Sequence, residues 1–160
     1  MGERQLTLVV CGAPLAARAG EVADALSVWW NVSVVATDAA SQWFDERSEH
    51  DRPRPDAVVA CPLTFNTANK VTAGIMDTSA AGALCDALGA GVPVVAVPMV
   101  NNRLWGHPVW LPTLRTLAGA GVRFVDAQSG RIGDPAPVQS GTGPEVVAAF
   151  DPAWVVAALG

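Results

Sequence analysis

The sequence predicts a doubly wound α/β fold, in which helices cover both faces of one sheet of parallel strands. Five short Val-rich runs show little alternation of apolar and polar residues, which is typical of parallel strands buried on both faces. Stretches of helical character and length separate these runs, as βαβ units require. Gly89, Gly91 and Gly121 fall where two of the helices should stop, and they support this division of the chain.

The elements follow one another in a regular alternation. Their Val-rich composition predicts strands at residues 5–12, 31–37, 56–61, 93–99 and 122–126. Their length and spacing of apolar residues predict helices at 15–30, 67–91 and 107–121. Strict alternation adds a further helix between the second and third strands. The Gly-, Pro- and Ser-rich segment at about 127–145 breaks the pattern, and its length favours a flexible functional loop.

Composition limits the classes of protein to consider. With 160 residues, 51% of them hydrophobic, the chain fits one domain spanning 1–160. Its formal charge of -5 and the lack of any Lys/Arg run argue against nucleic acid as a partner. No apolar run reaches the roughly 18 residues that span a bilayer, and the N-terminal run is too short for a signal peptide. We therefore expect a cytoplasmic protein that does not enter membranes.

The three cysteines are an odd number, and each lies in apolar sequence. None shows the spacing of metal ligands, so no metal site is expected. Buried, reduced thiols are the simpler interpretation, and a redox role is the alternative.

The residues after each predicted strand are candidates for a binding site, because open α/β sheets bind ligands at the carboxyl ends of their strands. After the first strand, Gly12 and Ala13 lead into a helix N-terminus that suits a phosphate, although a plain tight turn fits as well. After the second, the hydroxyls of Thr37 and Ser41 suit the same phosphate or a helix cap.

The third and fourth strands both end in Pro followed by amide side chains. The first of these ends, "PLTFNT" at 62–67, is followed by Asn69, and the second, "PMVNNRLW" at 98–105, contains Asn101. Amides both donate and accept hydrogen bonds, so they suit a neutral heterocycle or a substrate's amide and carboxylate groups. Ordinary loops remain the alternative at this stage.

Together the two segments resemble the homo-oligomeric flavin-containing cysteine decarboxylases. "PLTFNT" resembles the family's PASANT motif, and "PMVNNRLW" is similar to its PxMNxxMW motif. Asn69, Lys70, Gly74, Ile75 and Asp77 also meet the pattern NK....GI.D. The resemblance covers most of residues 6–126, and its continuation is most similar to the peptide-modifying branch.

The resemblance implies a Rossmann-like, flavodoxin-type fold that binds FMN. It also implies oxidative decarboxylation of the C-terminal cysteine of a peptide to an enethiol, in a homotrimer or a trimer-based dodecamer. Subunit contacts would then explain tryptophans expected at the surface, such as Trp105 and Trp110. Asn101 would hold the substrate carboxylate, with Arg103 and His107 as further substrate contacts. The residues implied for FMN are Gly12, Ala13, Thr37 and Ser41 at the phosphate, and Pro62, Thr64, Phe65, Asn66, Thr67 and Met99 at the isoalloxazine ring.

The catalytic histidine of the family has no direct match. Its place is taken by Ser48, and His50 reaches that register only if the segment between it and Pro62 is two residues shorter than in the family; a solvated His50 is the alternative. Three other functions stay open. They are decarboxylation of a small cysteine conjugate such as phosphopantothenoylcysteine, a non-catalytic FMN-binding regulatory or assembly subunit, and a flavin-prenylating relative.

Overall fold

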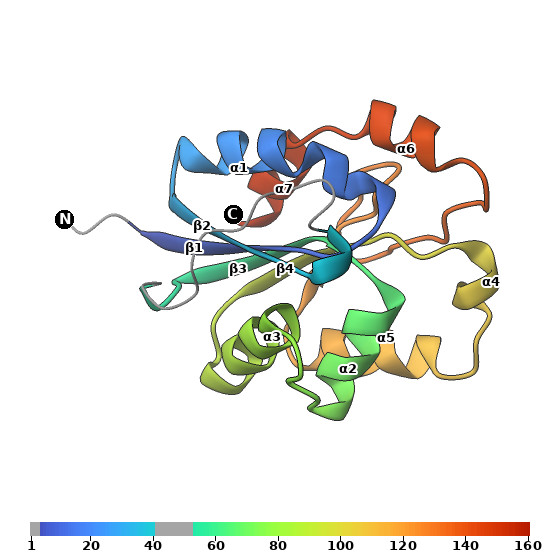
Figure 1. Ribbon diagram of the computed structural model, residues 1–160, viewed down its shortest axis with the longest axis horizontal. Coiled ribbons are helices and arrows are strands. Elements are labelled where there is room, and N and C mark those ends of the chain that lie inside the picture. Colours follow the sequence, from blue (N-terminus) through green and yellow to red (C-terminus); the bar gives the residue numbers. More distant parts are fainter. Residues whose placement is uncertain (1–3, 41–52) are drawn as a thin grey trace.

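Five parallel strands form one sheet in the order β2-β1-β3-β4-β5 (Figure 1). The computed structural model describes residues 4–40 and 53–160. The strands are β1 (Gln5–Val10), β2 (Asn31–Ala36), β3 (Ala57–Leu63), β4 (Val94–Pro98) and β5 (Arg123–Phe124). Every pairing between neighbours is parallel, and the order is that of flavodoxin-like sheets. The predicted doubly wound α/β fold is confirmed.

Helices cover both faces of the sheet (Figure 1). One face carries the 3-10 helix η1 (Pro14–Arg18) and the helices α1 (Ala19–Ser27), α6 (Gly143–Ala149) and α7 (Ala153–Ala158). The other face carries α2 (Phe65–Ala73), α3 (Ser79–Ala90) and α5 (Trp110–Gly119). The short helices η2 (Asp38–Ala40) and α4 (Asn102–Trp105) follow β2 and β4 at the carboxyl edge.

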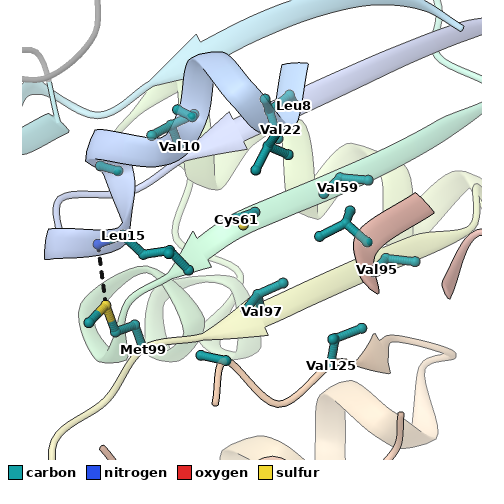
Figure 2. Packing of buried hydrophobic residues seen from close by; sticks show 14 of the residues in the cluster. Leu8, Val10, Leu15, Val22, Val59, Cys61, Val95, Val97, Met99 and Val125 are labelled. Atoms are coloured by element: carbon teal, nitrogen blue, oxygen red, sulfur yellow. Dashed lines mark hydrogen bonds between the residues drawn. The ribbon is translucent and has the colours of Figure 1, made fainter. Parts of the chain in front are cut away.

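Successive residues of each strand enter two separate cores. Val10, Val59 and Val97 belong to the core beneath α1, α6 and α7, and Figure 2 shows them packed together. Their neighbours Val9 and Val58 belong to the core beneath α2, α3 and α5. Because both faces of the central strands β1, β3 and β4 are buried, these strands read as hydrophobic runs rather than as alternating patterns.

The single helix predicted at 67–91 is two helices. Gly74 ends α2 in the left-handed conformation, with φ 72°, which a glycine adopts without steric cost. Thr78 then caps α3 by accepting a hydrogen bond from the Ala81 N–H at 3.1 Å. Gly89 lies inside α3, and the helix ends at Gly91 with φ 70°.

Two further expectations meet the structure differently. The helix predicted between the second and third strands falls largely at residues 41–52, outside the described residues. The helices α6 and α7 were not predicted, although Pro144 and Pro152 stand at their starts, where proline is common. Within residues 4–40 and 53–160, no helix combines the length and the apolar character needed to cross a membrane.

Candidate functional site

Main-chain hydrogen bonds tie three strand ends together at the carboxyl edge of the sheet. The Cys11 N–H donates to the Pro62 oxygen at 3.2 Å, and the Met99 N–H donates to the Leu63 oxygen at 3.0 Å. The register between β3 and β4 shifts after Ala60, and the Cys61–Pro62 peptide bond is cis. The loops after β1, β3 and β4 therefore form one continuous surface.

The loops after β1 and β2 touch at Gly12. A Cβ added to Gly12 would lie 2.5 Å from the Ala39 Cβ and 2.9 Å from the Ala39 carbonyl carbon. Thr37 Oγ1 accepts a hydrogen bond from the Ala40 N–H at 3.2 Å and so caps η2. The structure thus brings Gly12, Ala13 and Thr37 to one corner of the sheet. Ser41 lies outside the described residues.

The residues after β3 divide between the surface and the interior. Thr64 caps α2 by accepting from the Thr67 N–H at 3.3 Å, while Thr67 itself is buried and Asn66 is exposed. Asn69 Oδ1 accepts the Thr113 hydroxyl at 2.7 Å between α2 and α5, so this oxygen is used inside the chain, and contact of Asn69 with a heterocycle stays a prediction. The first turn of α2 therefore contributes to the edge.

The buried thiols of Cys11 and Cys61 are not nucleophiles. Burial raises the pKa of the Cys11 thiol, and hydrogen bonds with Thr67 and Thr64 offset part of this rise. Burial and the neighbouring Cys11 also raise the pKa of the Cys61 thiol. Both thiols therefore stay protonated and neutral at pH 7. No group of His, Cys, Asp or Glu side chains among the described residues could hold a metal ion.

An aromatic cluster supports Phe65, which replaces an Ala of the family motif. Its ring lies 5.5 Å from both the His107 and the Trp110 rings, and Trp105 lies 5.6 Å from Trp110. The expectation that Trp110 is exposed is wrong, because its side chain is fully buried against this cluster, whereas Trp105 is half-buried. Packing within one chain, rather than a subunit contact, accounts for Trp110.

His107 is exposed, and one of its ring nitrogens is already used. The Val109 N–H donates to His107 Nδ1 at 3.1 Å. In the neutral ring the proton is therefore on Nε2, which is left to contact solvent or a ligand.

Asn101 uses the oxygen of its side-chain amide to begin a helix. Its Oδ1 accepts hydrogen bonds from the Arg103 N–H at 3.1 Å and the Leu104 N–H at 2.9 Å, and so caps α4. Its Nδ2 group, a pure donor, makes no hydrogen bond to residues 4–40 or 53–160 and so can donate to a ligand. Arg103 lies exposed in the first turn of α4, two residues further along the chain.

A cavity of about 360 Å³ adjoins Asn101. The described residues that line it include no charged side chain. Met99 forms part of its wall, and the Leu15 N–H donates to Met99 Sδ at 3.4 Å (Figure 2). The wall is completed by residues that follow α5 in the chain or open η1: Val138, Gln139, Ser140, Gly141, Gly143, Pro144 and Pro14.

The contribution of the 127–145 segment to this cavity was not predicted. Its Gly-, Pro- and Ser-rich composition predicts a loop, but no local pattern shows which strand end a loop will contact. The mobility predicted for residues 127–145 stays a prediction. His50, the predicted catalytic residue, lies outside the described residues.

The family follows from the sequence itself. A family model described as Flavoprotein matches residues 41–146, which is more than half of the chain. The chain belongs to the flavoprotein family. This assignment confirms the resemblance predicted from the motifs at 62–67 and 98–105.

Individual relatives extend the comparison for this flavoprotein. It is 31% identical over 78 residues to the coenzyme A biosynthesis bifunctional protein CoaBC of Thermococcus kodakarensis, across 49% of this chain. The matched region is 19% of that protein, so the flavoprotein spans only a small part of this curated relative.

Two solved structures share the fold over nearly the whole length. A PPC decarboxylase mutant has a TM-score of 0.70 at 17% identity, covering 98% of this chain and 97% of that one. The FMN-dependent cysteine decarboxylase SpaF has a TM-score of 0.68 at 20% identity, covering 98% of both chains. At these identities the likeness shows a common fold.

Proposed function

We propose that this flavoprotein binds FMN at the carboxyl edge of its sheet and oxidatively decarboxylates the C-terminal cysteine of a peptide. The observation that carries the proposal is the side-chain amide of Asn101, which the α4 cap holds through its Oδ1 beside an uncharged cavity that Asn101 helps to line. A carboxylate is the natural acceptor for its Nδ2 donor. SpaF, an FMN-dependent cysteine decarboxylase, has the same fold.

The residues at the edge fit FMN. Gly12 lets the loops after β1 and β2 meet beside Ala13, the residue at which η1 begins. Of the ring contacts proposed below, Met99 lines the uncharged cavity beside Asn101. The proposed phosphate contacts are Gly12, Ala13, Thr37 and Ser41, and the proposed ring contacts are Pro62, Thr64, Phe65, Asn66, Thr67 and Met99.

The protein's own residues hold and orient the substrate. Bound FMN supplies the oxidation, taking up the two hydrogens that the cysteine loses as CO2 leaves. Asn101 Nδ2 donates to the carboxylate until CO2 departs and thereby aligns the cysteine Cβ with the cofactor. Arg103 attracts the same carboxylate, and His107 offers Nε2–H to the preceding peptide group. His50 remains the proposed acid–base residue.

A small cysteine conjugate is the second candidate substrate, because a PPC decarboxylase has this fold. A phosphorylated conjugate calls for Lys or Arg at its phosphate. None occurs among the described residues that line the cavity, and this favours the peptide.

A set of synthetic peptides ending in Cys tests the reaction. We expect FMN-loaded protein to convert such a peptide to a product that has lost CO2 and two hydrogens, detected by mass spectrometry. The same peptide with an amidated C-terminus should be inert, because it has no free carboxylate. His50→Ala should slow turnover without loss of bound flavin. If flavin is bound but no free-acid peptide reacts, the non-catalytic FMN-binding function is favoured instead.

A homotrimer, or a dodecamer built from trimers, is part of the same proposal. Leu104, Val109 and Leu111 lie close to the site along the chain and are 40%, 40% and 51% exposed. A neighbouring copy would cover them. We expect light scattering after size exclusion to give the mass of a trimer or its multiple, with flavin absorbance in the same peak. A colourless protein that FMN cannot reconstitute would contradict the cofactor, and a yellow monomer would contradict the assembly alone.

A further inference from the structure

Asp126 is a buried carboxylate at the end of the short strand β5. Its side chain is 4% exposed, and both of its oxygens accept hydrogen bonds. Oδ2 accepts the Ser129 N–H at 2.9 Å and the Ser129 hydroxyl at 2.7 Å, and the Gln128 N–H lies 3.3 Å away. Oδ1 accepts the Ala136 N–H at 3.0 Å. The carboxylate therefore ties Asp126 to a residue ten positions further along the loop.

The main chain of Asp126 closes the same loop. Its N–H donates to the Arg131 oxygen at 2.9 Å, and its oxygen accepts the Gly130 N–H at 2.9 Å. Val125 and Ile132 form an antiparallel bridge beside this turn. The segment from Asp126 to Ala136 is thus held at both ends by one residue.

The far end of the loop is attached to the residues beside Asn101. The Val138 N–H donates to the Val100 oxygen at 2.9 Å, and the Asn102 N–H donates to the Val138 oxygen at 2.9 Å. The Ser140 N–H then donates to Asn102 Oδ1 at 2.8 Å. The hydrogen bond from Asp126 thus ends at Ala136, and two residues further along the chain Val138 bonds both main-chain neighbours of Asn101 and lines the cavity.

We propose that Asp126 is a positioning residue, which holds the loop so that Val138–Gly141 forms the substrate-binding wall beside Asn101. Its effect on substrate rests on the proposed function, whereas its effect on the loop does not. A carboxylate is needed because two separate oxygens must accept: an asparagine has one acceptor and would turn an NH2 group toward an N–H donor. An N–H group that loses its carboxylate acceptor on burial can bond to water only if the loop opens, so the substitution favours the open loop.

Limited proteolysis measures the loop directly, because Arg131 supplies a trypsin site within it. We expect Asp126→Asn to speed cleavage after Arg131 by about tenfold or more, because cleavage follows the population of the opened loop. Fragments are identified by mass, so that cleavage elsewhere is counted separately. Asp134→Asn is the matched control. The Asp134 carboxylate is 76% exposed, and its ion pair with Arg131 is long, at 3.9 Å, and therefore weak, so cleavage should change less than about twofold.

Ser129→Ala provides a milder variant if Asp126→Asn does not fold. It removes one donor to Asp126 Oδ2 and should give a smaller increase in cleavage of the same bond. Cleavage of both variants at the wild-type rate would overturn the positioning role.

Kinetics with a peptide ending in Cys separates positioning from general damage. We expect Asp126→Asn to raise KM several-fold with bound FMN retained and kcat changed less, because ordering of the wall affects substrate binding. An unchanged KM together with faster cleavage would show that the loop is held by Asp126 but does not bind substrate, which overturns the proposal. A wild-type protein that turns over no peptide refutes the proposed function, while the cleavage rates still decide whether Asp126 holds the loop.

Discussion

Asn101→Asp is expected to lower kcat/KM for a peptide ending in Cys by about 10³-fold, with little effect on folding. The new carboxylate can still accept from the Arg103 and Leu104 N–H groups, so the α4 cap is preserved. It replaces the Nδ2 donor with an anion, which repels the substrate carboxylate. Initial rates at several peptide concentrations and a thermal unfolding curve for each protein provide the measurement.

Asn102→Asp is the matched control for added charge. Its Oδ1 accepts the Ser140 N–H, and a carboxylate can do the same, so the loop stays attached. We expect a loss of less than about tenfold from a charge placed one residue away. Equal losses in the two variants would mean that Asn101 has no specific part in binding the carboxylate. Retained activity in Asn101→Asp would remove Asn101 from the proposed site.

The fold was predictable because burial on both faces leaves a signal in every strand. Val9 and Val10 are adjacent in the chain, yet they enter different cores, so apolar and polar residues do not alternate along the strand. The break between α2 and α3 was harder to see. Its signal is Gly74 followed by the Thr78 cap, within a stretch whose Ala-rich composition favours one continuous helix.

The candidate site was predictable where the sequence motif also determines the local geometry. Asn101 and Thr64 each follow a strand and begin a helix, so the motif and the cap occupy the same positions. Contacts between distant segments could not be predicted in this way. Val138 reaches Asn101 only through the loop that Asp126 organises, and Trp110 is buried by Phe65 from another helix. Such pairings depend on the tertiary arrangement and leave no periodic pattern.

Gly12→Ala is expected to destabilise the protein by about 2 kcal/mol and to weaken FMN binding by about 100-fold. The added Cβ would lie 2.5 Å from the Ala39 Cβ and 2.9 Å from its backbone, so the loops after β1 and β2 must separate. Separation moves the backbone at Ala13 away from Thr37, and hydrogen bonds proposed to hold the phosphate are lost. Urea unfolding of the flavin-free protein and FMN titration followed by flavin fluorescence measure the two effects separately.

Gly20→Ala makes the same chemical change where nothing lies within 4 Å of the added Cβ. Gly20 is exposed in α1, where alanine favours the helix, so this variant should gain up to about 1 kcal/mol and bind FMN normally. The opposite signs of the two substitutions isolate the contact with Ala39 from any general effect of replacing glycine. A Gly12→Ala protein that loses stability but keeps its FMN affinity would show that this corner is structural and that the phosphate binds elsewhere.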